Sequence, residues 1–303
     1  MKPYSYTISK PSEIEGVISA FRSLGASGCS LLISIFTSYT KREGLQEMVD
    51  ALSLSFPEAE ISGMTSSVCI NQGVNHTGKI IVLFEVFEKT YVHTICFDHE
   101  PGKEETVGCA VMSEIAKISE PLCGIEILAS QSDDRFSDFT PFLNVLTREL
   151  PTTLPVWGAL ADSQTWPDHT YVFSKKYIST AGLVLRVYTG EISIMLNHVL
   201  GFRPLSRPLT VTAMDGPMII KELDHKPAVY YYDKYIHTPD FQEQSLPFPL
   251  IQQYDGYDHA HLPQGRTLDG GIIFNIRCAV GTELRLSYGD PELMLSETKK
   301  IWE

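Results

Sequence analysis

The fold is decided by residues 31–63, which read LLISIFTSYTKREGLQEMVDALSLSFPEAEISG. The segment opens with a short apolar run, 31–36, which is typical of a buried β-strand. The next stretch predicts an amphipathic helix, because apolar residues recur there at helical spacing: Leu45, Met48, Val49, Leu52 and Phe56. Pro57 ends this helix, and a short strand then leads to Gly63.

The same pattern occurs a second time along the chain. Residues 125–129 predict the strand, Pro151 ends the helix, and residues 154–157 lead to Gly158. The apolar face of the second helix consists of Phe139, Phe142, Leu143, Leu146 and Leu150. The helix positions and the two prolines differ by a constant 94 residues, and one inserted residue brings the two glycines into line. We therefore predict an internal duplication.

The match extends in both directions from these segments. A further helix is predicted before each strand, at 12–24 and at about 104–118. After each glycine we expect two strands joined by a tight turn, at 79–87 with 91–97 and at 182–188 with 192–200. Each repeat then reads α–β–α–β–β–β, over about 10–100 and 104–200. The predicted class is α/β (α+β), with the two units forming a pseudo-symmetric core.

The sequence pattern changes after His198, where prolines separate short predicted strands with alternating apolar residues, such as 209–213 and 218–223. We expect a duplicated domain over 1–204 and a smaller α+β domain over 205–303. The second domain ends in a helix that starts at Asp290 as N-cap, with Pro291 at its first position. No glycine or proline ends this helix, so we expect it to pass a signal onward; the alternative is an ordinary terminal helix packed on the sheet.

Composition limits the classes of function. The formal net charge is −13, from 24 basic and 37 acidic residues, and no dense basic run is present, which argues against nucleic-acid binding. The apolar runs are far shorter than the ~20 residues of a membrane helix, and no leader opens the chain, so we expect a cytoplasmic location. The six cysteines form no C-x-x-C pair, which favours free thiols over a zinc site.

Four stretches together resemble the FIST sensor family, in both its N-terminal and its C-terminal domain, over about residues 25–292. They are ISGMTSS at 61–67, PVWGALAD at 155–162, LGFRP at 200–204 with LTVT at 209–212, and ELDHKPA at 222–228 followed by Tyr235. Four features depart from the pattern of the family: Met64 replaces a common cysteine, Phe202 a tryptophan, Ser206-Arg207 a common Gly-Pro and His225 a glycine.

The resemblance implies an intracellular signal-input domain, not an enzyme, that binds a small ligand such as an amino acid or similar metabolite. It would regulate a fused or partner output module, such as a diguanylate cyclase, histidine kinase or chemoreceptor in bacterial signalling. Some family members resemble haem-containing nitric-oxide sensors, so a haem-based gas sensor is an alternative. A protein-docking scaffold is another.

An enzyme of hydrolase or transferase type is the weakest alternative. The chain contains no G-x-S-x-G, H-E-x-x-H or phosphate-binding glycine motif. Ser66, Ser67 and Cys29 are candidate nucleophiles, but the sequence identifies no base for any of them.

The candidate ligand site combines residues of the two repeats. Glycine and small polar side chains at a strand end let backbone N–H groups approach a ligand closely. We therefore expect the ligand to lie near the pseudo-two-fold axis, against Gly63, Met64, Thr65 and Ser66 of one repeat, Gly158, Ala159 and Asp162 of the other, and Arg203. The alternatives are that both glycines form tight turns demanded by the fold, and that Arg203 makes a structural ion pair.

Two histidines are candidate haem ligands. His198 lies on the apolar face of the strand predicted at 192–200, and His93 shares a face with Tyr91, Ile95 and Phe97. A histidine in an apolar lining is what an axial ligand requires. The alternative for each is a core histidine that hydrogen-bonds to a backbone carbonyl.

Overall fold

The computed structural model describes residues 1–130, 139–163, 170–236, 247–254 and 257–302. The chain divides into two compact units, residues 1–196 and 197–303, each of which is described by itself. None of the helices in these residues is long and apolar enough to cross a membrane.

Unit 1 (residues 1–196) contains two sheets. The strands of the first sheet are ordered β1-β6-β2-β3-β10-β11. Their bounds are β1 (Lys2–Ile8), β2 (Ser30–Thr37), β3 (Glu60–Thr65), β6 (Ile80–Phe87), β10 (Val172–Ser174) and β11 (Tyr177–Ser179). A 3-10 turn (Pro11–Glu13) precedes helix α1 (Ile14–Ser23), and helix α2 (Arg42–Ser55) connects β2 to β3. A separate hairpin consists of β4 (Val68–Asn71) and β5 (Val74–Thr77).

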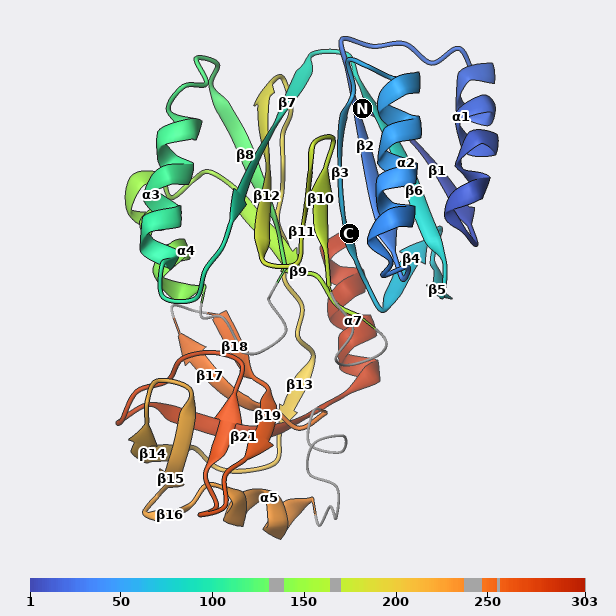
Figure 1. Ribbon diagram of the computed structural model, residues 1–303. Helices are drawn as coiled ribbons and strands as arrows, with labels where there is room; N and C mark the ends of the chain where they lie inside the picture. Colours follow the sequence, from blue (N-terminus) through green and yellow to red (C-terminus); the bar gives the residue numbers. More distant parts are fainter. Residues whose placement is uncertain (131–138, 164–169, 237–246, 255–256, 303) are drawn as a thin grey trace. The chain divides into compact units, whose positions relative to one another are not determined.

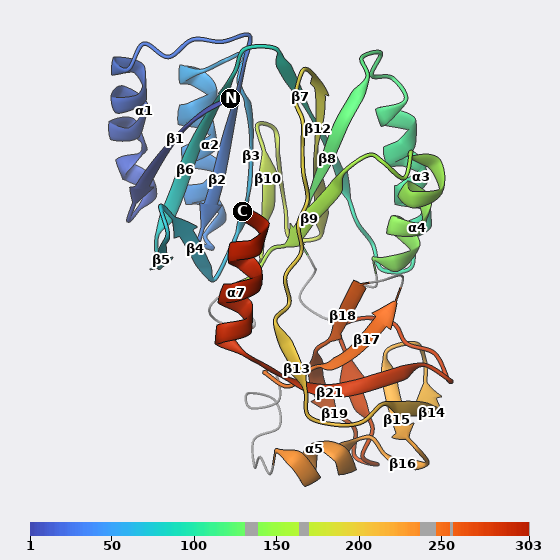
Figure 2. The same cartoon turned by 180° about the vertical axis from the view of Figure 1, so that it is seen from behind.

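The second sheet of unit 1 has the order β7-β12-β8-β9. Its strands are β7 (Thr90–Asp98), β8 (Leu122–Ala129), β9 (Val156–Leu160) and β12 (Gly182–Gly190), with helices α3 (Glu104–Ile115) and α4 (Thr140–Glu149). Helices α1 and α2 cover the outer face of the first sheet, and α3 and α4 cover that of the second (Figures 1 and 2).

The inner faces of the two sheets pack on each other. One apolar cluster includes Leu32, Phe87, Val92 and Tyr188, and another includes Met64, Leu128, Val172 and Val184; both join strands of the two sheets. Unit 1 is therefore a four-layer α/β/β/α structure, and the mixed α/β class predicted from the sequence is confirmed.

The two sheets share one topology. The order β1-β6-β2-β3 matches β7-β12-β8-β9 strand for strand, and the middle pairs run antiparallel while β2/β3 and β8/β9 run parallel. Ile35 pairs with Gly63 in one sheet, and Ile127 pairs with Gly158 in the other. This common topology supports the internal duplication, which we keep as a proposal about the origin of the chain.

The repeat differs from the predicted α–β–α–β–β–β order. Residues 192–200 form no strand, so the hairpin predicted at 182–200 is wrong. The hairpin predicted at 79–97 is also wrong, because β6 lies in the first sheet and β7 in the second. Strand β7 instead occupies the position in its sheet that β1 has in the first sheet. The sequence analysis did not predict β1. Each repeat thus begins with a strand, and the shared part of the two sheets spans 2–87 and 90–190.

A buried arginine joins the two sheets of unit 1. The side chain of Arg186 on β12 is 2% exposed. Its Nε and Nη2 donate to the hydroxyl and carbonyl oxygens of Ser62 on β3, at 2.7 and 3.0 Å, and its Nη1 donates to Glu126 Oε2 at 2.9 Å. Burial raises the pKa of the neighbouring Glu85, although the charge of Arg186 acts in the opposite direction.

Unit 2 (residues 197–303) is built on one sheet, ordered β18-β17-β21-β14-β15-β20-β19, with β13 paired to β21 and β16 to β15. The strands are β13 (Phe202–Pro204), β14 (Leu209–Asp215), β15 (Ile219–Leu223), β16 (Lys226–Pro227), β17 (Leu250–Tyr254), β18 (Tyr257–His261), β19 (Pro263–Arg266), β20 (Ile272–Phe274) and β21 (Glu283–Gly289). Its helices are α5 (Val229–Tyr235) and α7 (Pro291–Trp302).

The core of unit 2 lies on one face of this sheet and contains Leu209, Tyr232, Leu250, Leu284 and Leu286. Asp290 Oδ1 accepts a hydrogen bond from the backbone N–H of Leu293 at 2.9 Å, which confirms Asp290 as the N-cap of α7.

The Arg186 network leads to a stability prediction. We expect Arg186→Leu to lower the free energy of unfolding by about 3–5 kcal/mol, because it leaves Glu126 buried without its counter-ion. This loss should shrink as the pH falls from 7 to 5, because burial raises the pKa of Glu85, and protonation of Glu85 removes a charge that Arg186 no longer offsets in the variant. Urea denaturation at both pH values measures the effect.

The double variant R186L/E126L should recover much of this loss, because it leaves no buried charge in the pair. Arg148→Leu is the control, since Arg148 pairs with Glu149 at the surface and such pairs contribute less than about 1 kcal/mol. Equal losses for R186L and R148L would contradict the prediction.

Candidate functional site

The polar segments predicted to bind a ligand lie at the carboxyl ends of β3 and β9, and the structure brings these two ends together. The backbone N–H of Asp162 donates to the carbonyl of Thr65 at 3.1 Å. The hydroxyl of Ser67 donates to the Asp162 carboxylate. The first repeat and the second repeat therefore meet where their parallel strands end.

Further polar groups surround this contact. The hydroxyl of Ser38, just after β2, lies 3.4 Å from the Ser67 carbonyl, and the backbone N–H of Ser66 donates to the Thr37 carbonyl at 2.8 Å. Thr65 is fully buried, and its hydroxyl accepts the backbone N–H of Tyr171 at 2.9 Å. Ser66 and Ser67 are half-buried and Asp162 is exposed. We name Ser38, Ser66, Ser67 and Asp162 the strand-end site.

The two glycines have a structural role. A Cβ atom added to Gly63 would lie 2.0 Å from the Ile35 carbonyl oxygen and 2.8 Å from the Phe173 ring. A Cβ atom on Gly158 would lie 2.0 Å from the Ile127 carbonyl oxygen. Both positions therefore require glycine for close contact with the parallel neighbour strand. Both glycines lie within strands, so this requirement is structural but does not come from the tight turns that we weighed as the alternative.

Met64 and Ala159 do not belong to the strand-end site. Met64 is 9% exposed and packs between the sheets with Leu128, Val172 and Val184. Ala159 is exposed on β9, one residue before the end of the strand.

Arg203 lies in unit 2, on β13, and forms an ion pair with Asp290. Because Asp290 is the N-cap of α7, Arg203 fixes the start of that helix. This is the structural ion pair that we weighed as the alternative for Arg203, and its partner is Asp290.

The two candidate haem ligands have polar or exposed surroundings. His198 is exposed and meets the Tyr257 ring edge-on at 5.9 Å; it lies outside any strand, so its predicted apolar lining is wrong. His93 on β7 is half-buried, and its Nε2 lies 3.3 Å from the Thr189 hydroxyl. An axial ligand needs an apolar pocket. These two environments therefore do not fit haem, and the function proposed below does not involve it.

The described residues contain no group of three or more His, Cys, Asp or Glu side chains that could hold a metal ion.

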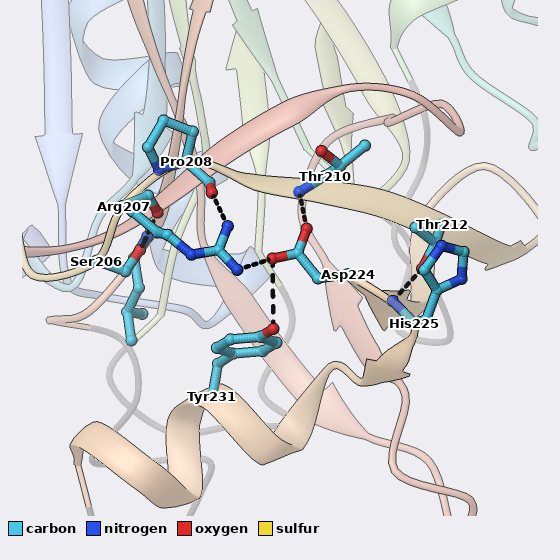
Figure 3. A network of polar contacts seen from close by, with 9 residues as sticks. Ser206, Arg207, Pro208, Thr210, Thr212, Asp224, His225 and Tyr231 are labelled. Carbon is cyan, nitrogen blue, oxygen red and sulfur yellow. Dashed lines mark hydrogen bonds and ion pairs between the residues drawn. The ribbon is translucent and has the colours of Figure 1, made fainter.

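In unit 2, two of the segments that resemble the family, 209–212 and 222–228, meet in one hydrogen-bonded network (Figure 3). The Asp224 carboxylate accepts the backbone N–H of Thr210 at 2.9 Å and pairs with the Arg207 guanidinium at 2.6 Å; the Tyr231 hydroxyl lies 3.5 Å away. Burial alone would raise the pKa of Asp224, but the Thr210 N–H and Arg207 outweigh it and hold the pKa below its usual value. The network thus has a structural role.

Asp224 and His225 form the tight turn between β15 and β16. Both have left-handed backbones, with φ of 47° and 60°. Such turns favour glycine, because a side chain in this region of φ/ψ space is strained. The turn therefore explains why glycine is common at the position of His225.

A hollow of about 290 Å³ opens on the face of the unit 2 sheet opposite its core. Its floor carries both signs of charge, from Asp258 on β18 and from Glu283 and Arg285 on β21, and its wall includes Phe202. The sequence analysis named Phe202 only as a departure from the family pattern and missed the three charged residues. The only signal of Glu283 and Arg285 is alternation with Leu284 and Leu286, which any solvated strand face shows.

A second hollow, of about 460 Å³, lies in unit 1 at the end of α4. It is lined mainly by apolar residues, including Leu143, Leu146, Leu150 and Leu154.

The backbone of His225 leads to a second prediction. We expect His225→Gly to raise the free energy of unfolding by about 1 kcal/mol, because it relieves a left-handed non-glycine residue. Lys226→Gly, at the next and extended position, should instead destabilise unit 2. Chemical denaturation compares the two variants, and stabilisation by both would refute this explanation of the turn.

The Asp224 network gives a third prediction, on pH. Because the folded-state pKa of Asp224 is lowered, its ionised carboxylate stabilises the folded state above the unfolded-state pKa near ~4. This stabilisation is lost as the pH falls through the folded-state pKa. Asp224→Asn should lower the free energy of unfolding by about 1 kcal/mol at pH 7, and the difference from the wild type should become smaller below pH 4. Asp215→Asn changes an exposed residue on β14 and should have little effect on the free energy of unfolding at either pH.

The comparison with known families agrees with this architecture. The model of the FIST N domain matches residues 31–226, which include β2 to β16 and both segments of the strand-end site. No curated protein matches the chain. A match over this share of the sequence places the chain in the FIST family, whose domains are generally small-ligand sensory domains of signalling proteins.

Proposed function

We propose that this chain is the input domain of a signalling system and binds a small polar ligand at the strand-end site. One observation carries the proposal: the carboxyl ends of the two parallel strand pairs converge there, with the Ser67 hydroxyl hydrogen-bonded to the Asp162 carboxylate. In open α/β sheets, ligands bind outside the carboxyl ends of the strands.

The groups at this site indicate the class of ligand. The Asp162 carboxylate is exposed and accepts hydrogen bonds only, so it favours an ammonium or hydroxyl donor. The half-buried serines Ser38, Ser66 and Ser67 supply hydroxyl groups that both donate and accept. An amine-bearing metabolite such as an amino acid matches this set.

The same contacts disfavour catalysis by the two serines. The Ser66 hydroxyl donates to the Val68 carbonyl at 2.7 Å, and a carbonyl is no general base. Ser67 donates to the Asp162 carboxylate, which is exposed to solvent and does not lie in an apolar pocket of the kind that activates catalytic carboxyl groups.

Helix α7 is the element we assign to output. Its N-terminus is held by Arg203 and Asp290, while Leu295 is 64% exposed. The exposed side of this capped helix is the surface that we propose docks to an output module, fused or separate. A diguanylate cyclase, a histidine kinase and a chemoreceptor are the partners we propose to test, and the FIST C-terminal domain stays a proposal for unit 2.

The fourth prediction tests the site. A thermal-shift screen of the purified chain against the common amino acids, dicarboxylates and polyamines should give a stabilising hit. We expect Asp162→Asn and Ser67→Ala each to weaken the binding of that hit about tenfold or more, because each removes a charged hydrogen bond of ~1.5–3 kcal/mol. Isothermal titration calorimetry measures the affinities.

Asp258→Asn and Arg285→Gln are the matched controls, since both lie in the hollow of unit 2. Loss of binding in these variants, with D162N unaffected, would place the ligand in unit 2 and contradict the proposal. An intense Soret band in the purified protein would instead favour the haem-based alternative, and a complete lack of hits would favour a docking scaffold.

A further inference from the structure

The hairpins of the two repeats of unit 1 differ in the strands with which they pair. In the second repeat, hairpin β10–β11 leaves its own sheet and covers the edge strand β3, pairing Phe173 with Gly63 in antiparallel sense. The corresponding hairpin of the first repeat, β4–β5, pairs with no other strand of the described residues. The edge strand that corresponds to β3 is β9, and among the described strands it pairs with β8 alone.

We propose that the open edge of β9 binds hairpin β4–β5 of a second copy of this chain, and that two copies exchange hairpins reciprocally. The pairing would reproduce between two molecules the contact that β10 makes with β3 within one. Such an interface is two-fold symmetric and closed, because each copy offers one edge and one hairpin.

Among the residues that the structure describes, no strand pairs with the outer edge of β9. Ile125 N donates to the Pro155 carbonyl, and Ala161 N donates to the Ala129 carbonyl, so the odd-numbered residues of this segment face β8. The backbone N–H and C=O groups of Gly158 and Leu160 therefore point away from β8, toward the edge. Both residues are exposed.

Strand β9 also lacks the usual protection of an edge. Its sequence, VWGAL, contains no charged residue and no proline, the devices that block edge-to-edge pairing in monomeric proteins. Leu160 is 48% exposed at its end.

Hairpin β4–β5 has matching properties. Its sequence over 68–77, VCINQGVNHT, contains no Lys, Arg, Asp or Glu. Three apolar side chains are largely exposed on it: Val68 at 45%, Ile70 at 71% and Val74 at 55%. Exposed apolar residues grouped on one small element mark an interaction surface.

The hairpin does not pair with β9 of its own chain, although the ends of β3 and β9 meet through the hydrogen bond between Thr65 and Asp162. The hairpin instead packs beside β2 and β6, where Asn71 Nδ2 donates to the Thr7 hydroxyl at 2.9 Å. Two residues connect β3 to β4, whereas the connection from β9 to β10 is far longer, over 161–171, which allows β10 to cross between the sheets.

The fifth prediction is that the full chain dimerises and that the dimer depends on both elements. Ile70→Lys on the hairpin and Leu160→Lys on the edge should each raise the dimer dissociation constant at least about tenfold, because both place a charge in the shared sheet. Leu54→Lys is the control: Leu54 is 87% exposed on α2, away from both elements. Sedimentation equilibrium measures the constants, and thermal melting checks that each variant is folded.

Mixing the two variants gives the sharper test. A dimer of I70K with itself has no intact hairpin, and a dimer of L160K with itself has no intact edge. A mixed dimer of I70K with L160K keeps one intact edge–hairpin pair, so association should reappear on mixing. A monomeric wild type, equal weakening by L54K, or no association in the mixture would each overturn the proposal.

Discussion

Burial of the Arg186 guanidinium between two sheets is the constraint on which the rest of unit 1 depends. A lone charge in this position would cost several kcal/mol, so it must be neutralised and hydrogen-bonded. Glu126 neutralises the charge within the second sheet, and Ser62 binds it from the first, through both its hydroxyl and its carbonyl oxygen. Apolar packing between sheets has little directionality, whereas these hydrogen bonds define how β12 lies against β3.

That packing determines where the candidate site forms. Once β3 and β12 are held together, the parallel pairs β2/β3 and β8/β9 end close to each other, and Thr65 and Asp162 share a backbone hydrogen bond. The strand-end site is therefore a consequence of joining the two repeats. Neither repeat alone would place the Ser67 hydroxyl beside a carboxylate of the other.

Duplication also accounts for the asymmetry of the molecule. The two repeats share one topology but place their hairpins differently. The connection after β3 has two residues and holds hairpin β4–β5 near its own sheet, whereas the longer connection after β9 lets hairpin β10–β11 leave its sheet. The first sheet thereby gains β10 and β11, and the second keeps an open edge at β9. In unit 2, by contrast, Asp224 lies in the turn between β15 and β16 and links Arg207, Thr210 and Tyr231 within that unit.

The sequence by itself determined the local elements of this protein. Apolar spacing located α2 and α4, prolines marked their ends, and Asp290 was identified as a helix cap, because such signals depend only on neighbours along the chain. Glycine and small polar residues at two predicted strand ends brought Thr65, Ser66 and Asp162 forward as candidates. The alternation of residues 192–200 suggested a strand, but these residues form none.

Only the tertiary structure decided which strands share a sheet. β6 and β7 are adjacent in sequence, yet they belong to different sheets, because hydrogen bonding to β2 and to β12 outweighs closure of a short turn. The roles of Gly63, Gly158 and Arg203 were likewise decided by atoms distant in sequence: the carbonyls of Ile35 and Ile127, and the carboxylate of Asp290. Long-range contacts of this kind leave no periodic trace in a single sequence, since each depends on where another part of the chain has packed.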